Sequence, residues 1–248
     1  MKISIITATW NSALTIEDTI QSLRNQTYSD FEYIVVDGGS TDNTMNIIED
    51  NEDIIDYSVS ENDAGIYDAL NKGISAATGD VIGFLHSDDV FAHKDVLNSI
   101  ASFFIASKSD SVYGDLNYVS KNDTSKIVRK WRSGVFARHK MRNGWMPPHP
   151  TFYMRRDLYE KYGAFDLSYD IAADYDSILR YLWKYRVTTA YIPDVLINMR
   201  VGGASNRSLR NIIRKTREDI QTMKSNGLPT IRAIIGKNLT KVPQFFLN

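Results

Sequence analysis

The stretch from Ser60 to Asp89, SENDAGIYDALNKGISAATGDVIGFLHSDD, decides the class of fold. Apolar residues recur at helical spacing over Ile66–Ala77, and Gly79 stands where this helix is expected to end. The run Val81–Leu85 is apolar throughout, which is typical of a buried strand, and it leads into an acidic turn. A helix followed by a short turn and a buried strand is the repeating unit of a parallel α/β sheet.

The same alternation extends back to the N-terminus. The earlier expected elements are strands at Ile3–Thr9, Tyr33–Val36 and Asp56–Ser60, and helices at Leu14–Asn25 and Thr41–Asp50. This order predicts an α/β fold with a mainly parallel central sheet flanked by helices. In such sheets ligands bind beyond the carboxyl ends of the strands, so the residues that follow the strands are the candidates for a functional site.

Beyond a helix expected over Asp95–Ala106, the pattern becomes mixed. The expected strands are Ser111–Tyr118, Lys126–Trp131, Thr151–Met154, Thr188–Tyr191 and Leu196–Arg200, and the expected helices are Arg156–Tyr162 and Asp174–Lys184. No repeat or low-complexity linker separates the two halves. We therefore expect them to share one core.

The composition is that of an ordinary globular protein, with 248 residues of which 43% are hydrophobic and 24% charged. Cysteine is absent, which excludes disulfides and thiolate metal sites and leaves oxygen or imidazole ligands for a metal. No apolar run reaches the roughly 20 residues that span a bilayer, and the N-terminal residues lack the features of a signal peptide. We therefore expect a cytoplasmic protein.

The charge is unevenly distributed. Residues 207–248 carry nine basic and two acidic residues, a net charge of +7, whereas residues 1–206 carry −8. Apolar residues recur in this tail at near-helical spacing, which predicts a basic helical extension that could contact the inner face of an anionic membrane. Helices packed on the domain with a solvated basic face are the alternative. No aromatic–basic platform accompanies the charge, so no nucleic-acid partner is expected.

The residues that follow the expected strands are polar and rich in carboxylates. The first strand leads into TATWNSA, which lacks the glycines of a dinucleotide-binding turn and argues against a nicotinamide enzyme. Asp88 and Asp89 follow the strand Val81–Leu85 as neighbours. Adjacent carboxylates repel each other unless protons or a cation offset their charge, and Mg²⁺ is commonly held by one or two carboxylates plus substrate phosphates. A plain turn or helix cap is the alternative.

Two further aspartates each have a chemical and a structural interpretation. Asp174 opens the expected helix Asp174–Lys184, where it could take a proton from an acceptor hydroxyl as a general base or simply cap the helix. Asp37 ends the second strand before two glycines, where it could accept a hydrogen bond from a nucleobase or serve as a turn residue. The residues alone leave both alternatives open.

Together these segments resemble family 2 glycosyltransferases with the GT-A fold, in particular those of colanic-acid and other bacterial polysaccharide biosynthesis. The resemblance covers roughly residues 1–206. It rests on six motifs in order, which are SIITATWN from Ser4, IVVDGGSTDNT from Ile34, the stretch from Ser60 quoted above, PHPTFYMRRDLYEKYGAFD from Pro148, AADYDSILR from Ala172 and MRVGGASN from Met199.

The resemblance implies a donor-binding set in the first half of the chain. Thr9 and Asp37 match positions that hold the nucleobase and ribose. Asp63 and Lys72 lie in a stretch similar to the family's donor-binding segment, and Ser87 lies inside the motif that meets the donor's diphosphate.

The resemblance also implies a metal site and a catalytic base. Asp88 matches the last aspartate of the family's DxD motif, with Asp89 as its neighbour, and the implied metal is Mg²⁺ or Mn²⁺. Asp174 matches the family's catalytic base. Two positions depart from the pattern, because His86 replaces the first aspartate of DxD and Ala173 replaces the glutamate before the base.

The implied activity is metal-dependent transfer of a sugar, with inversion, from a nucleotide-diphosphate sugar such as a UDP-sugar to a sugar or lipid-linked saccharide. Residues 1–107 would form the nucleotide-sugar half of a catalytic domain, residues 108–206 the acceptor half, and residues 207–248 the tail. Three further residues are candidates near the acceptor or the diphosphate, His149, Arg200 and Arg207. The alternatives are a sugar nucleotidyltransferase, whose glycine-rich basic loop is absent, and a non-catalytic nucleotide-sugar-binding protein.

Overall fold

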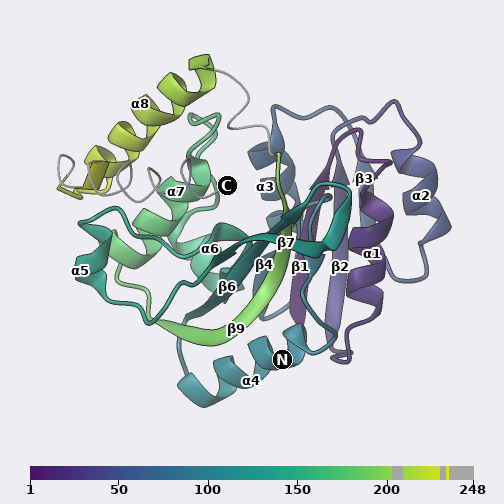
Figure 1. The fold of residues 1–248 in the computed structure, drawn as a ribbon, viewed down its shortest axis with the longest axis horizontal. Helices are drawn as coiled ribbons and strands as arrows, with labels where there is room; N and C mark the ends of the chain where they lie inside the picture. The colour runs from purple at the N-terminus through teal and green to yellow at the C-terminus, as the bar shows by residue number, and fades with distance from the viewer. Residues whose placement is uncertain (203–208, 230–232, 235–248) are drawn as a thin grey trace.

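A computed structural model describes residues 1–202, 209–229 and 233–234 (Figure 1). Within these ranges the chain forms a nine-stranded sheet in the order β3-β2-β1-β4-β8-β6-β9-β5, with β7 paired to β6. The strands are β1 (Ile3–Thr9), β2 (Phe31–Asp37), β3 (Tyr57–Ser60), β4 (Val81–Phe84), β5 (Val90–Phe91), β6 (Ser111–Ser120), β7 (Asp123–Trp131), β8 (Tyr153–Arg155) and β9 (Thr189–Arg200). The helices are α1 (Ile16–Arg24), α2 (Thr44–Asp50), α3 (Ile66–Ala76), α4 (Val96–Ser107), α5 (Arg138–Met141), α6 (Arg156–Tyr162), α7 (Ala173–Ile178) and α8 (Leu209–Ser225).

The first half confirms the expected parallel sheet. Strand β1 pairs in parallel with β2 and β4, and β2 pairs in parallel with β3. The register places Thr9 opposite Asp37 and Asp37 opposite Ser60, so three strand ends are level at the carboxyl edge. Side chains at this edge can therefore meet although they are far apart in sequence.

Both faces of this half-sheet are covered. Alternate residues of β1 and β2 belong to two separate apolar clusters, as expected from the two-residue repeat of a strand. One cluster includes Ile6 and Val36 and packs against α3, α6 and α7. The other includes Ile5 and Val35 and packs against α1 and α4. Figure 1 shows α1 and α2 on one side of the strands and α3 and α7 on the other.

The second half adds antiparallel pairs to the sheet. Strand β8 lies antiparallel between β4 and β6, while β6 and β9 run in parallel. The sequence predicted two strands near Thr188–Tyr191 and Leu196–Arg200, and the structure joins them into the single long strand β9, with irregular register against β6. The sequence did not predict β5, because a two-residue strand has no measurable periodicity.

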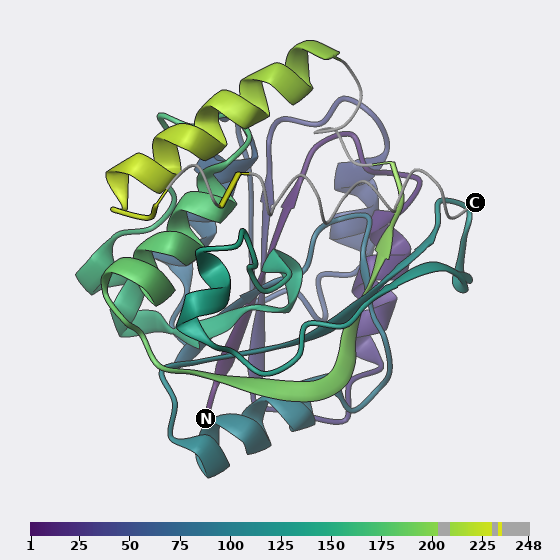
Figure 2. The ribbon, with the colours of Figure 1, turned by 60° about the vertical axis from the view of Figure 1, so that its left-hand side comes forward.

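The helix expected over Asp174–Lys184 consists of α7 and a π-helical turn at Leu179–Lys184. Helix α8, the described part of the basic tail, lies along α7 in both views (Figures 1 and 2). Met223 of α8 and Leu228 just beyond it are buried in the same apolar cluster as α7. Among the described residues, no helix is both long and apolar enough to cross a membrane.

Candidate functional site

Asp37 organises the carboxyl ends of β2 and β3. Its Oδ2 accepts hydrogen bonds from the backbone N–H groups of Gly39 (3.0 Å) and Ser40 (2.8 Å) and from the Ser60 hydroxyl (2.6 Å). Oδ1 accepts one bond, from the Ser40 hydroxyl at 2.5 Å. Since a carboxylate oxygen has two lone-pair sites, Oδ1 retains capacity for a ligand N–H or O–H. The aspartate is thus a turn residue whose Oδ1 keeps acceptor capacity, although the residue is 0% exposed in this structure.

Thr9 carries a buried hydroxyl beside this turn. The residue is 4% exposed, and its Oγ1 has no hydrogen-bond partner in the described part of the chain. A buried hydroxyl without a partner is unfavourable and marks a place that a ligand or water completes. The next two residues shape the same edge, because Trp10 is 66% exposed and Asn11 has a left-handed φ of 48°. The Asn11 side-chain oxygen accepts the N–H of Thr41 at 2.9 Å and so ties the first turn to the second.

Asp63 lies against the glycine turn after β2. A Cβ atom on Gly38 would come within 2.5 Å of Asp63 Oδ2, so the Asp63 side chain packs directly on the backbone of this glycine and would have to shift for any larger residue. Asp63 Oδ1 also accepts the N–H of Gly65, at 2.8 Å, just before α3. The structure therefore places Asp63 next to the Asp37 turn, and its role in donor binding stays a prediction.

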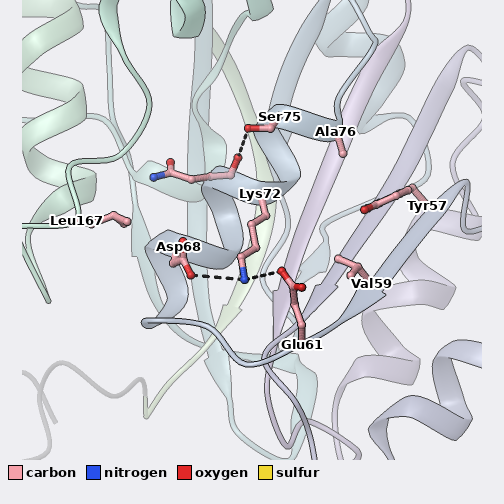
Figure 3. Close-up of a pocket in the computed structure, with 9 residues that line it drawn as sticks. Tyr57, Val59, Glu61, Asp68, Lys72, Ser75, Ala76 and Leu167 are labelled. Carbon is pink, nitrogen blue, oxygen red and sulfur yellow. Dashed lines mark hydrogen bonds and ion pairs between the residues drawn. The ribbon is translucent and has the colours of Figure 1, made fainter.

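Lys72 occupies a different place. Its Nζ lies 2.8 Å from Glu61 and 3.5 Å from Asp68, in a pocket of about 600 Å³ between β3 and α3 (Figure 3). Asp88 and Asp174 do not line this pocket. In this structure two carboxylates compensate the ammonium, and its donor-binding role stays a prediction.

The acidic turn after β4 is partly buried. Asp89 is 1% exposed, and its Oδ1 accepts the backbone N–H of Arg200 at 3.1 Å. Burial, and then the negative charge of Asp88, raise the pKa of the Asp89 carboxyl well above its usual value. Ser87 lies at the same turn, with its hydroxyl 2.9 Å from that of Ser12. Burial and the neighbouring charge thus both favour the protonated form of Asp89 in the absence of a cation.

Arg200 braces this turn from β9. Its Nη1 donates to the backbone oxygen of Asp88 at 2.7 Å, its Nε donates to that of Lys121 at 3.1 Å, and the guanidinium pairs with Asp18. Arg200 is buried, and these hydrogen bonds hold the acidic turn in place. Arg207 lies outside the described residues.

The donor set suits a hard divalent cation that keeps room for substrate oxygens. Within the described ranges, no group of three or more His, Cys, Asp or Glu residues could enclose a metal ion. Asp88 is partly exposed at this turn and Asp89 is buried beside it in sequence, and a third protein ligand is not required where phosphates and waters complete the shell. Carboxylate oxygens of this kind are compatible with a hard cation such as Mg²⁺ or Mn²⁺ that is held mainly by substrate oxygens and water.

Asp174 is the second residue of α7 and remains partly exposed. Its Oδ1 accepts the N–H of Tyr175 at 2.7 Å and lies 3.4 Å from the hydroxyl of Tyr67. The carboxylate is therefore held at one oxygen. The sequence analysis missed Tyr67, because nothing in the pattern of α3 shows a contact 107 residues away in the chain.

Two buried or partly buried histidines, His86 and His149, lie near the acidic turn. His149 stacks on Phe84 with ring centroids 5.3 Å apart, and its ring lies 6.0 Å from that of His86. Burial lowers the pKa of His149 to about 4, although the charge of Asp174 acts in the opposite direction. Burial also lowers the pKa of His86, against the charges of Asp88 and Asp174. The charges of Asp88 and Asp174 therefore both act on His86.

The fold is that of GT-A glycosyltransferases. S. aureus TarS 1–349 in complex with UDP has a TM-score of 0.70 and 22% identity, over 97% of this chain and 71% of that one. The mannosyltransferase PcManGT from Pyrobaculum calidifontis, in complex with GDP-Man and Mn²⁺, has a TM-score of 0.64 and 17% identity, over 99% and 75% of the two chains. At these identities the likeness establishes the fold alone.

Sequence comparison establishes the family. The model of glycosyl transferase family 2 matches residues 4–163. A PGL/p-HBAD biosynthesis glycosyltransferase of Mycobacterium bovis is 34% identical over 210 residues, 82% of this chain and 78% of that protein. An uncharacterized glycosyltransferase of Nostoc sp. is 30% identical over 221 residues, 83% and 66% of the two chains. The chain belongs to glycosyl transferase family 2 and is a transferase.

Proposed function

We propose that this transferase moves a sugar from a UDP-sugar to an acceptor hydroxyl with inversion at the anomeric carbon, in bacterial surface glycan biosynthesis. One observation carries the proposal. The charges of Asp88 and Asp174 both act to raise the pKa of His86, so the two carboxylates lie in the neighbourhood of one imidazole. This supports a site in which one carboxylate serves the diphosphate and the other accepts the proton.

Residues 1–107 form the donor half in this proposal. Thr9 Oγ1 and Asp37 Oδ1 offer a hydroxyl and a carboxylate oxygen with unused capacity, which suit a nucleobase edge and a ribose hydroxyl. Asp63 supports the same turn. UDP as the nucleotide is supported by TarS, which is similar in fold and has been solved with UDP and with UDP-GlcNAc.

Asp88 and Asp89 would hold Mg²⁺ or Mn²⁺ at the diphosphate, with Ser87 beside them. A divalent cation supplies positive charge that stabilises the negative charge developing on the departing phosphate. Arg200 keeps the turn in position through the backbone of Asp88. His86 and His149 are neutral near pH 7 and therefore add no positive charge that would compete with the metal.

Asp174 is the general base in this mechanism. It takes the proton from the acceptor hydroxyl while that oxygen attacks the anomeric carbon on the face opposite the diphosphate. A single displacement of this kind inverts the configuration. Residues 108–206 provide the acceptor half, with His149 lining it. We propose a sugar or a lipid-linked saccharide as acceptor and a peripheral membrane contact through residues 207–248, whose net charge of +7 suits an anionic surface.

The substitution Asp174→Asn tests the central step. We expect it to lower transfer by about two to four orders of magnitude, because general base catalysis commonly contributes about 10²–10⁴ in rate. The measurement is UDP release from UDP-glucose, UDP-galactose and UDP-GlcNAc with Mn²⁺ and a mixture of candidate acceptors, together with UDP affinity by calorimetry. Asp166→Asn is the matched control on an exposed loop position.

Near-normal turnover by the Asp174→Asn variant with unchanged UDP binding would contradict the assignment of the base. A wild-type protein that binds UDP but neither transfers nor hydrolyses a UDP-sugar would instead indicate a non-catalytic binding protein. The anomeric configuration of the product, measured by NMR coupling constants, tests inversion separately.

A further inference from the structure

The loop before Asp174 is held from two sides by residues distant in sequence. From α8, Glu218 accepts hydrogen bonds at Oε2 from the backbone N–H groups of Ile171 (2.8 Å) and Ala172 (2.9 Å). From α3, the hydroxyl of Tyr67 donates to the backbone oxygen of Ile171 at 2.7 Å. Both peptide units of Ile171 are therefore fixed, and Ala172 is the N-cap of the helix that carries Asp174.

Glu218 can hold this loop in place because its carboxylate is buried and its negative charge is compensated by a neighbouring arginine. The residue is 8% exposed, and Arg214, one turn earlier, places its Nε 3.3 Å from Glu218 Oε1. The same guanidinium pairs with Asp170, the residue that precedes Ile171. Hydrogen bonds to a buried carboxylate are charge-assisted and are roughly twice as strong as neutral ones. The hydrogen bonds from Ile171 and Ala172 to Glu218 therefore restrict the conformation of the loop.

Further contacts keep α8 from shifting along α7. Asn226 donates to Oδ1 of Asp176 at 2.8 Å, and the indole N–H of Trp183 donates to the backbone oxygen of Gly227 at 3.2 Å. The position of Glu218 is thus fixed by contacts at the C-terminal end of α8 and just beyond it.

We propose that Glu218 is a positioning residue for the transfer reaction, which sets the place of the Asp174 carboxylate through Ile171 and Ala172. The inference rests on the proposed role of Asp174 as the base. A general base must lie about 2.6–3.2 Å from the atom whose proton it takes, and a displacement of about 1 Å lowers the rate about 100-fold. The tail helix is therefore part of the catalytic apparatus rather than an appendage.

The substitution Glu218→Gln keeps the shape of the side chain but disturbs both ends of the contact. One oxygen faces the N–H groups of Ile171 and Ala172, and the other faces Arg214 and the N–H of Asp170, which is 3.4 Å away. In either orientation of the glutamine side chain, its NH₂ group, which is a donor, faces N–H groups that are also donors and cannot accept from it. The loop then loses one set of its hydrogen bonds.

We expect Glu218→Gln to lower kcat about 10- to 100-fold, with the KM for the UDP-sugar within about twofold of wild type, as expected for misplacement of a catalytic group. Calorimetry with UDP and Mn²⁺ should give unchanged stoichiometry and affinity, which separates misplacement of the base from a loss of folded protein. Arg217→Gln, an exposed neighbour on α8, is the matched control and should retain wild-type kinetics.

A double-mutant cycle distinguishes positioning from general weakening. If Glu218 acts through Asp174, then Glu218→Gln should have less than a twofold effect on the residual activity of the Asp174→Asn variant. Tyr67→Phe removes the hydrogen bond to the Ile171 oxygen together with the 3.4 Å contact to Asp174 Oδ1, so it should also lower kcat and lose its effect in that background. This second variant tests the support of the same loop from α3 if Glu218→Gln does not fold.

Two results would overturn the inference. One is near wild-type kcat in both Glu218→Gln and Tyr67→Phe while Asp174→Asn is inactive, which would leave the proposed function intact. The other is a full additional loss of activity when either substitution is combined with Asp174→Asn. Normal activity of Asp174→Asn alone would instead refute the proposed function, so the two failures are distinguishable.

Discussion

At the scale of single residues, burial decides the chemistry of the site. His149 is nearly inaccessible, and its pKa of about 4 keeps the imidazole neutral at physiological pH. Thr9 shows a related effect, because its buried hydroxyl has no partner among the described residues. Neither property is visible in the sequence, since each depends on which side chains surround the group.

Metal removal tests the acidic turn at this scale. We expect EDTA to abolish transfer and Mg²⁺ or Mn²⁺ to restore it, because the adjacent carboxylates of Asp88 and Asp89 and the diphosphate need a compensating cation. Asp88→Asn should raise the metal concentration for half-maximal activity about tenfold or more. Asp53→Asn, an exposed aspartate paired with Arg24, is the control. Full activity in EDTA would contradict the metal assignment.

At the scale of elements, the carboxylate of Glu32 links the amino-terminal ends of β1, β2 and β4, at the edge of the sheet opposite the site. Glu32 of β2 accepts hydrogen bonds from the hydroxyl of Ser4 in β1 and from the backbone N–H groups of Thr78 and Gly79 before β4, and it pairs with Lys2. Burial acts to raise the pKa of Glu32, but the bonds from Lys2, Ser4 and Thr78 outweigh it and lower the pKa to about 2. This contact fixes the register on which the strand ends of the site depend.

The lowered pKa predicts how stability changes with pH. Because the folded pKa of Glu32 lies below the value of 4.5 for an unperturbed glutamate, its contribution is complete above pH 4.5 and is lost as the pH falls towards 2. We expect Glu32→Gln to lower the free energy of unfolding by about 2–3 kcal/mol at pH 7. Denaturant unfolding at pH 7 and at pH 3 should show this difference shrinking to about half or less.

The control for this measurement is Glu160→Gln, which removes an exposed i,i+4 pair with Arg156. Such pairs contribute only about 0.3–0.5 kcal/mol, so its effect should be small at both pH values. A stability loss in Glu32→Gln that stays constant from pH 7 to pH 3 would refute the linkage.

At the scale of the whole molecule, the described part of the basic tail packs against the domain through α8 and the residues just beyond it. It packs on α7 through buried Met223 and Leu228 while Ile212 and Ile213 on the same helix remain 48% and 56% exposed. The described tail thus combines a docked face with an exposed apolar pair among basic residues. Such a surface suits an anionic membrane.

Vesicle flotation tests this surface in the intact protein. We expect binding to phosphatidylglycerol vesicles that weakens with salt, because attraction of basic residues to an anionic surface is screened within about 10 Å at 0.1 M ionic strength. The double substitution Ile212→Asn and Ile213→Asn should reduce binding several-fold and leave transfer to a water-soluble acceptor unchanged. Equal binding to neutral phosphatidylcholine, or no effect of the substitutions, would contradict the membrane proposal.

The sequence alone determined the parallel half of the sheet and the composition of its carboxyl edge. Hydrophobic periodicity over β1, β2, β4 and α3 is a local property, and local properties can be read along the chain. The motif pattern also identified the family and indicated Asp37, Asp88 and Asp174. Both signals come from residues close together in sequence.

Only the tertiary structure decided how these aspartates are supported. The insertion of β8 between β4 and β6 and the approach of His149 to His86 depend on packing between distant segments. So do the hydrogen bonds to Glu218 from Ile171 and Ala172, which lie 47 and 46 residues earlier in the chain. Such contacts have no sequence period, because they are selected by the shape and polarity of surfaces that exist only after folding. The stretch from Ser60 to Asp89 therefore determined what kind of sheet forms, while the packing of α7, α8 and β9 around it decided where the reactive groups stand.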